Sequence, residues 1–393
     1  MRRIVKKIKP WAAQRLEWIL LWCFSHLAKY RRCRRPTNQI LIARTDGLGD
    51  FALWLDAQKQ LRALYPKKKL VMILDSTKPT LPWAEQCPDI DEVYYVDVRR
   101  YRRFFEVFRM TRRSYDIVIQ PVYGRTAFTD LLLFACRADQ RITLDGGKRF
   151  LTDWEKQVTG RAYDQIVPAA AGVRHELIRC AELIRGLGKP DYLAKLPRCA
   201  EAGRRSFAKE PYVAVYPGGS WVEKCWDPIK FAQVCDWIIE QTGYRIYLCG
   251  GEGDAPIVEA VYQAMVHAGW ADIFAGKSDM VQSVQTISGA AFVFGNDTGA
   301  IHIAAVSGVA SAAIVADREW GRFFPYEVET TSPDDCFPIS IHSDAPCKGC
   351  VLEGGEGCRF QEREGSRLLC IERISVEQVK AALADWIDGA MAR

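Results

Sequence analysis

Asp297, Thr298 and Gly299 stand between an apolar segment, 289–294, and a run rich in small residues that extends to Ala305. The pattern predicts a strand, a tight turn and a helix, with a carboxylate, a hydroxyl and backbone N–H groups at the helix N-terminus. Such a turn can bind a diphosphate, because the N–H groups and the helix dipole both favour an anion. An acidic N-cap beside a glycine is also an ordinary strand-to-helix turn, so this stretch alone leaves both interpretations open.

A second loop of this kind, Pro217–Lys224, follows the apolar segment 212–216. Its glycines offer backbone donors, Ser220 offers a hydroxyl and Lys224 offers a mobile cation. Together these groups suit a diphosphate leaving group. Taken alone, Lys224 is better explained as an exposed lysine beside a packing tryptophan.

Two more polar residues of this half have both a binding and a structural interpretation. Glu252 follows a Gly-Gly turn, where it would accept hydrogen bonds from ribose hydroxyls or would simply be a solvated turn acid. His302 lies on the first turn of the predicted helix after Gly299, where it would face a ligand or serve as a structural histidine.

In the N-terminal half, Asp50 stands at the start of a predicted helix, where the helix dipole favours its ionised form. It is a candidate general base toward a substrate hydroxyl, or a plain N-cap. The same loop reads Gly47-x-Gly49-x-x-Ala52, and Asp75 ends the next strand, which would fit an NAD(P)-dependent oxidoreductase. The distance from the strand to the first glycine argues against this alternative, because a fingerprint glycine normally follows its strand at once.

Strands and helices alternate along most of the chain, which predicts an α/β protein with two parallel-sheet domains. We expect strands at 39–43, 69–74, 92–96, 116–120 and 140–143, an irregular segment at 145–170, and then strands at 212–216, 245–249, 290–294 and 311–315. A Pro-containing linker is expected within 188–211. The predicted boundaries are a leader (1–37), an N-terminal sheet domain (38–195), a C-terminal sheet domain (205–335), and a Cys-rich loop with a C-terminal helix packing back on the first domain (336–393).

The leader combines basic and aromatic residues. Basic runs at 1–9 and 31–35 flank a predicted helix, whose apolar core at 18–24 is shorter than the ~20 residues needed to cross a bilayer. The composition favours an amphipathic helix on an anionic membrane surface, with docking on the protein's own body as the alternative. The net charge of +6 is modest for 393 residues, and no nucleic-acid partner is expected.

Fourteen cysteines occur in the chain, mostly as isolated thiols in apolar segments. Four gather near the C-terminus in a loop rich in glycine and charge: Cys347, Cys350, Cys358 and Cys370. Such a set can form a tetrahedral thiolate site for structural zinc or iron, or can remain as free thiols or a redox pair.

Taken together, three stretches resemble glycosyltransferase family 9, the ADP-heptose heptosyltransferases of lipopolysaccharide core assembly. They are 40–50, Pro217–Trp226 and Gly295–Ala305, and the resemblance runs from about 39 to 325. It implies a GT-B fold of two facing Rossmann-like domains, with the acceptor on the N-terminal domain (38–195) and the nucleotide-sugar on the C-terminal domain (205–335). The resemblance further implies inversion at the anomeric carbon without a catalytic metal. It also implies roles for single residues: Asp50 as the base, Ser220 and Lys224 on the diphosphate, Glu252 on the ribose, and Asp297, Thr298, Gly299 and His302 in the donor site.

On this basis we expect a cytoplasmic enzyme, peripheral on the inner membrane, that transfers heptose from ADP-heptose to a lipopolysaccharide core or a related glycan. A protein acceptor is the alternative, since the cysteine set looks similar to that of some heptosyltransferases acting on autotransporters. Candidate acceptor-binding residues are Arg44, Arg99, Arg102 and Arg103, which would meet acceptor phosphates.

Overall fold

The computed structural model divides the chain into two compact units, each built around one parallel sheet. The residues that the structure describes are 2–77, 81–99, 102–147, 150–199, 210–344, 349 and 367–391. Unit 1 comprises 1–47, 57–171 and 179–192, and unit 2 comprises 48–56, 172–178 and 193–393. Each unit encloses a hydrophobic core of its own.

Unit 1 contains a six-stranded sheet in the order β3-β2-β1-β4-β5-β6. Its apolar strands are buried on both faces, as the near-continuous hydrophobic runs predict. The strands are β1 (Gln39–Arg44), β2 (Lys69–Asp75), β3 (Glu92–Val96), β4 (Ser114–Gln120), β5 (Arg137–Leu144) and β6 (Gln165–Val167). The helices are α1 (Arg2–Leu27), the second part of α2 (Leu48–Leu64), α3 (Leu81–Glu85), α4 (Arg103–Met110), α5 (Ala127–Ala135), α6 (Asp153–Gly160) and most of α7 (Glu176–Gly186).

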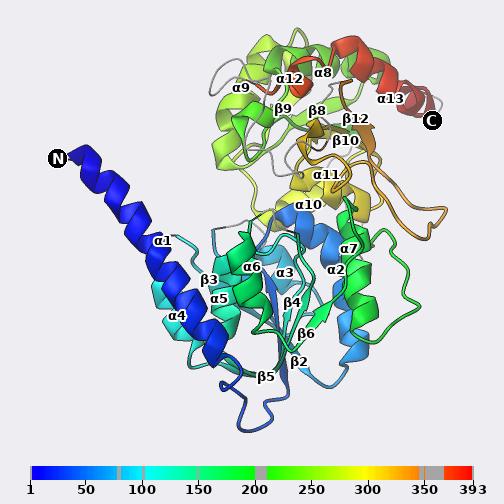
Figure 1. Cartoon of the computed structure of the whole chain (residues 1–393). Coiled ribbons are helices and arrows are strands. Elements are labelled where there is room, and N and C mark those ends of the chain that lie inside the picture. The colour runs from blue at the N-terminus through cyan, green and yellow to red at the C-terminus, as the bar shows by residue number, and fades with distance from the viewer. Residues whose placement is uncertain are drawn as a thin grey trace. The chain divides into compact units, whose positions relative to one another are not determined.

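Unit 2 repeats this topology in the order β12-β11-β10-β7-β8-β9. Its strands are β7 (Tyr212–Tyr216), β8 (Arg245–Leu248), β9 (Ala271–Ile273), β10 (Phe292–Asn296), β11 (Ser311–Ile314) and β12 (Ile339–Ile341). Its α-helices include α8 (Pro228–Thr242), α9 (Ala255–Ala264), α10 (Met280–Ser288), α11 (Gly299–Val306), α12 (Leu369–Glu372) and α13 (Val376–Met391), with 3-10 turns η1 (Val222–Lys224), η2 (Glu252–Asp254), η3 (Ala268–Trp270) and η4 (Asp317–Glu319). Figure 1 shows both sheets with their flanking helices.

Counted within its own unit, each sheet has the doubly wound order 3-2-1-4-5-6. In this topology the connections run to opposite faces on either side of the first strand, so a crevice opens outside the carboxyl ends of the first and fourth strands. The crevice lies at β1 and β4 in unit 1, and at β7 and β10 in unit 2. Each unit therefore offers one topological position for a ligand.

The prediction of two parallel-sheet domains is confirmed, but three strands were missed. The segment 145–170, expected to be irregular, contains α6 and β6, and neither β9 nor β12 was expected. Each missed strand is three residues long and stands at the edge of its sheet, where so short a run gives no readable hydrophobic period.

The C-terminal helix does not pack as expected. Instead of packing on the first domain, α13 packs on α8 and β12 within unit 2. Its residues Val379, Leu383 and Ile387 are spaced by one helical turn and enter the core of that unit.

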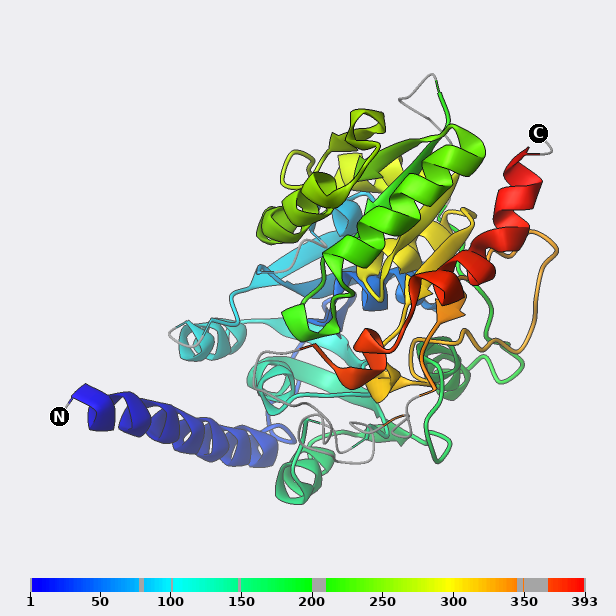
Figure 2. The ribbon, with the colours of Figure 1, turned by 90° about the horizontal axis from the view of Figure 1, so that it is seen from above.

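Helix α1 packs on unit 1 through one face and exposes another. Leu21 and Ser25 are buried where α1 meets α5 and α6, whereas Ile19 and Trp22 are largely exposed. Figure 2 shows the N-terminal part of α1 projecting beyond the sheet and helices of its unit. Within the described part of the chain, no helix is both long and apolar enough to span a membrane.

Candidate functional site

The crevice of unit 2 is shaped by Asn296, the last residue of β10, which is 2% exposed. Its side-chain amide donates to the carbonyls of Pro217 (2.6 Å) and Gly218 (3.2 Å), and its amide oxygen accepts from the backbone N–H of Trp226 (3.1 Å). Gly295 lets the two chains approach closely, because a Cβ there would come within 2.5 Å of the carbonyl oxygen of Tyr216. The two glycine-containing loops found in the sequence are therefore fixed side by side.

Helix α11 begins in this crevice with the polar turn that the sequence singled out. Thr298 is the N-cap residue, but its side chain does not cap the helix. Its Oγ1 is buried and has no hydrogen-bond partner in the described part of the chain. A buried hydroxyl without a partner is uncommon in proteins, and it stands where the helix N-terminus favours an anion.

Lys224 lies in the same crevice between two carboxylates. Its Nζ is 3.3 Å from Asp297 Oδ2 and 3.7 Å from Glu319 Oε2, and its side chain is only 14% exposed. Burial alone would lower the pKa of Lys224, but Asp297 and Glu319 outweigh burial and raise this pKa above its usual value. The lysine is therefore a permanent, positioned cation.

Asp50 belongs to unit 2, although the sequence places it in the first domain, because α2 is divided between the units after Asp56. Its Oδ1 is 3.5 Å from the guanidinium of Arg322. Arg322 also contacts Glu176 (3.4 Å) and Glu319 (3.3 Å). Glu319 contacts both Arg322 and Lys224, so it links the partner of Asp50 to Lys224.

The residues that connect these groups were not recognised from the sequence. Arg318, Glu319 and Arg322 follow β11, the strand that pairs with β10. Arg318 stacks over the ring of Trp221 at 4.4 Å, which places another cation beside the Ser220 loop. The signal was available, because in a parallel sheet the loop that leaves each strand lies at the ligand-binding edge, and 316–322 is such a loop.

His302 is buried rather than open to solvent, with 2% of its surface exposed. Its Nδ1 lies 2.6 Å from the hydroxyl of Tyr326, and its ring stacks on Phe324. Burial lowers the pKa of His302, although Asp297 and Asp50 act in the opposite direction. A Cβ on Gly49 would come within 2.5 Å of the His302 ring, so this glycine accommodates the histidine.

Ser220 and Glu252 are both exposed residues on the loops that leave β7 and β8. The loop of Glu252 is held by Asp254, whose Oδ2 accepts from the N–H of Gly251 at 2.8 Å. The carboxylate of Asp254 also fills the space next to Gly218, where a Cβ would be 2.2 Å from Oδ1.

The four arginines expected to bind an acceptor lie in unit 1. Arg44 is 1% exposed and pairs with Asp46 at 2.8 Å. Arg99 and Arg102 both contact the carboxyl group of Asp97. These contacts, chiefly the hydrogen bond from Arg99, lower the pKa of the Asp97 carboxyl to about 2. Arg103 contacts Glu17 at 3.3 Å. Arg44 thus pairs with a carboxylate of the loop that follows it, and the other three pair with Asp97 or Glu17.

A sequence model of glycosyltransferase family 9 (heptosyltransferase) matches residues 106–333, which is more than half of the chain. The chain belongs to glycosyltransferase family 9. This family 9 protein is 25% identical over 228 residues to lipopolysaccharide heptosyltransferase 3 of Escherichia coli K12, a match that covers 52% of this chain and 61% of the relative. It is 23% identical over 290 residues to lipooligosaccharide heptosyltransferase 2 of Haemophilus ducreyi, covering 68% and 79%.

Solved structures agree with this assignment at the level of the fold. A family 9 glycosyltransferase from Veillonella parvula superposes with a TM-score of 0.64 at 18% identity, covering 91% of this chain and 99% of that one. E. coli ADP-heptose heptosyltransferase II gives 0.61 at 16%, covering 89% and 99%. The enzyme thus has the predicted GT-B fold, and the oxidoreductase alternative is not retained.

Most of the C-terminal cysteine set of this glycosyltransferase, namely Cys347, Cys350 and Cys358, lies outside the described residues. Cys370 is described, in α12, and is 4% exposed. Elsewhere in the described part, Cys33, Asp116 and Asp139 lie within 4.8 Å of one another. Asp116, however, already accepts hydrogen bonds from Thr37, Asn38 and Lys68, which makes it a poor metal ligand.

A pH dependence of stability follows from His175 in unit 2. Its Nδ1 accepts from the N–H of Leu177 and its Nε2–H donates to the carbonyl of Phe323, so the ring is held neutral. Burial lowers the pKa of His175 from 6.5 to about 3. The folded pKa is below the unfolded one, so the unfolded state takes up a proton first, and stability is lost as the pH falls from about 6.5 toward 3. We expect a loss on the order of 2 kcal/mol between pH 7.5 and pH 5.

Denaturant unfolding at the two pH values checks this expectation. In His175→Gln, the free energy of unfolding should fall by about 2 kcal/mol less between these pH values than in the wild type. His267→Gln, a change at a surface ring, should leave the pH dependence of the wild type unchanged. Parallel profiles for the wild type and His175→Gln would contradict the assignment.

Proposed function

We propose that this glycosyltransferase moves a heptose from ADP-heptose to a hydroxyl group of a lipopolysaccharide core or a related glycan, with inversion. The names of its relatives support a heptose donor and a lipopolysaccharide acceptor, and the name of one similar solved structure includes ADP-heptose. The arrangement in unit 2 that carries the proposal is a carboxylate, Asp50, in the same unit as the anion-binding turn at Thr298 and the cation Lys224.

In the proposed reaction, Asp50 takes the proton of the acceptor hydroxyl while the hydroxyl oxygen forms a bond to the anomeric carbon. The bond from that carbon to the diphosphate breaks, and its electron pair leaves with ADP. The developing charge is stabilised by the N-terminus of α11, the Thr298 hydroxyl and Lys224. Arg322, held by two other carboxylates, keeps Asp50 in place.

The direct test is incubation of the purified protein with ADP-heptose and core oligosaccharides truncated at successive positions. Release of ADP, together with a mass increase of one heptose on one oligosaccharide, is the expected result. Heptose found on a protein acceptor instead would support the autotransporter alternative. No release with any glycan or protein acceptor would refute the proposal.

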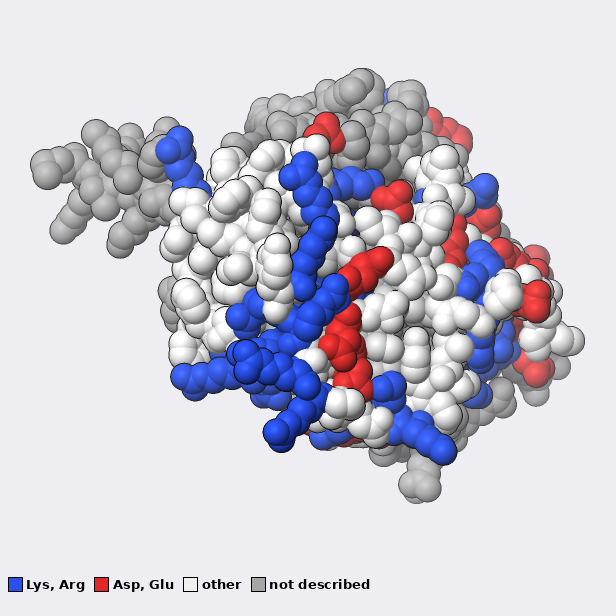
Figure 3. All heavy atoms as spheres, turned by 60° about the horizontal axis from the view of Figure 1, so that its bottom comes forward, with Lys and Arg blue, Asp and Glu red and all other residues white. Residues whose placement is uncertain are grey.

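We further propose that the enzyme works at the cytoplasmic face of the inner membrane, held there by α1 and α4. Unit 1 exposes apolar residues on α1 (Ile19, Trp22) and on α4 (Phe105, Phe108). The segment that follows α1, residues 31–35, is basic. Figure 3 shows Lys and Arg side chains gathered beside an area of uncharged side chains. This combination of apolar and basic groups suits an anionic lipid surface.

Vesicles containing phosphatidylglycerol test this proposal. Each of these side chains contributes about 1.5–3 kcal/mol when it enters lipid, so the double variant Ile19→Ser, Trp22→Ser should lose at least tenfold in sedimentation with vesicles. Val266→Ser, at an exposed apolar residue of unit 2, is the matched control. Undiminished binding of the double variant would exclude α1 as the anchor.

The cysteine set remains a proposal supported by its spacing: Cys347, Cys350, Cys358 and Cys370 would hold a structural zinc or iron ion as thiolates. Elemental analysis of the purified protein should find about one equivalent of metal, lost in Cys370→Ser. A metal-free wild type with full activity would favour the alternative of free thiols.

A further inference from the structure

A cavity of about 540 Å³ in unit 1 is not used by the proposed donor chemistry. It lies at the switch point of the sheet, because Thr45 follows β1 and the segment 126–129 follows β4. Its size falls within the range of small-molecule sites, about 300–1,000 Å³.

Helix α1 supplies one wall of this cavity through Glu17 and Trp18. The helix is firmly positioned at this wall: Trp18 Nε1 donates to Glu155 Oε1 at 2.9 Å, and Arg103 Nη1 donates to Glu17 Oε2 at 3.3 Å. The wall is therefore tied to α6 by one bond and to α4 by the other.

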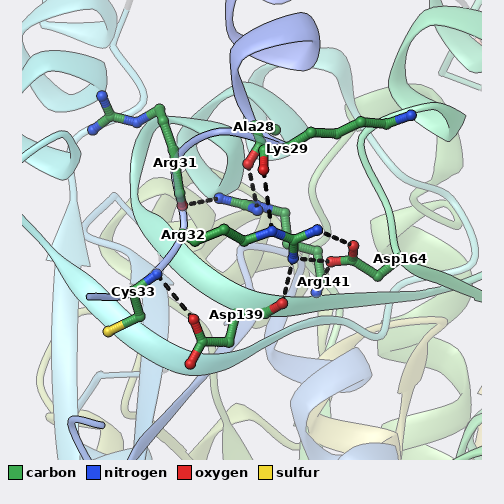
Figure 4. Close-up of polar contacts among 8 residues, drawn as sticks. All are labelled: Ala28, Lys29, Arg31, Arg32, Cys33, Asp139, Arg141 and Asp164. Atoms are coloured by element: carbon green, nitrogen blue, oxygen red, sulfur yellow. Dashed lines mark hydrogen bonds and ion pairs between the residues drawn. The ribbon is translucent and has the colours of Figure 1, made fainter. Parts of the chain in front are cut away.

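The carboxyl end of α1 is anchored as well. The buried guanidinium of Arg141 donates to the carbonyls of Ala28 (3.0 Å) and Arg31 (3.4 Å), and Arg32 forms a two-pronged pair with Asp164 (3.1 and 2.8 Å). Figure 4 shows these contacts of the segment after α1 with β5 and with Asp164, which precedes β6. The leader is thus part of unit 1 and holds a fixed position at the cavity.

The lining combines acceptor groups with aromatic rings. Carboxylates come from Glu17, Asp75 and Glu155, and one cation comes from Arg103, which also stacks on Phe128 at 5.0 Å. The lining also includes threonines and the rings of Trp18, Phe104 and Phe150. Carboxylates accept hydrogen bonds from hydroxyls, and rings pack on the C–H face of a sugar.

Among the described residues of the lining, three carboxylates face one guanidinium, and this balance of charge disfavours a phosphate. Burial raises the pKa of Glu17, against the attraction of Arg103. The ionised form of Glu17 repels an anion, and both protonation states can accept a hydrogen bond from a hydroxyl. The expectation that Arg103 meets an acceptor phosphate stays the alternative for this cavity.

We propose that this cavity binds an uncharged sugar ring of the acceptor, and that Glu17 and Trp18 of α1 help to select it. The inference rests on the proposed transfer to a glycan. The proposal gives the leader a second function beside membrane attachment, because one face of α1 contacts the acceptor while another face is free to contact lipid.

Calorimetry with deacylated core oligosaccharide, in phosphorylated and dephosphorylated form, tests the proposal without requiring turnover. Glu17→Gln keeps the shape but removes an ionic acceptor, so we expect roughly 10- to 100-fold weaker binding of the dephosphorylated oligosaccharide. Trp18→Phe should also weaken it, with ADP binding unchanged in both. Trp22→Phe, on the exposed part of the same helix, should bind as the wild type does.

Whether Glu17→Gln weakens or tightens oligosaccharide binding distinguishes an uncharged sugar from a phosphate as the ligand of the cavity. If the cavity held a phosphate, removing a negative charge would tighten binding of the phosphorylated form, and that result would overturn the proposal. Unchanged binding in both Glu17→Gln and Trp18→Phe, or no binding of dephosphorylated oligosaccharide to the wild type, would also overturn it. Failure of the proposed function would appear separately, as oligosaccharide binding with no heptose transfer.

Discussion

Asp50→Asn should lower kcat by about 10²- to 10⁴-fold, because a general base contributes a factor of that size. The amide keeps the shape of the carboxylate but cannot take the acceptor's proton. Arg322 retains Glu176 and Glu319 as partners, so the local structure should survive. Affinity for ADP should remain as in the wild type, as measured by calorimetry.

The matched control for this change is Asp56→Asn, on the same helix and in the same unit. Asp56 pairs with Lys195 at 3.4 Å and has no proposed part in the chemistry. Its kcat should therefore stay normal. A rate for Asp50→Asn within twofold of the wild type would remove Asp50 from the base role and leave it as an acidic residue in the first turn of α2.

Lys224→Met should weaken ADP binding by roughly 10- to 100-fold, the effect of losing a hydrogen bond from a charged donor. The substitution removes the charge and keeps most of the chain length. It also leaves Asp297 and Glu319 facing the diphosphate without the cation between them. Their repulsion adds to the loss, so kcat should fall together with affinity.

The comparison for Lys224→Met is Lys277→Met, at an exposed lysine of unit 2, for which ADP affinity should not change. A melting temperature close to that of the wild type shows that the variant is folded. If such a folded Lys224→Met bound ADP with unchanged enthalpy and affinity, the lysine would be a structural counter-ion of Asp297 only.

The sequence by itself determined the kind of protein and the location of its binding loops. Apolar runs that alternate with helices predict parallel sheets, and in such sheets the polar turns after the strands must meet at one edge. For that reason the sequence pattern is sufficient to identify Ser220, Lys224 and Thr298 as candidates, since each belongs to a loop that leaves a predicted strand.

Only the tertiary structure decided which charges face one another. Lys224 and Asp297 are 73 positions apart, and the pairing of Lys224 with Glu319 and of Asp50 with Arg322 joins still more distant loops. Local periodicity carries no information about such pairs, because their geometry arises from the order of strands in the sheet.

The leader shows the same limit. Its composition predicted a basic amphipathic helix, but an amphipathic pattern does not say whether lipid or protein covers the apolar face. In the structure one face packs on α5 and α6 and another is exposed. The wall that Glu17 and Trp18 build at the cavity exists only because distant residues, Arg103 and Glu155, hold them there.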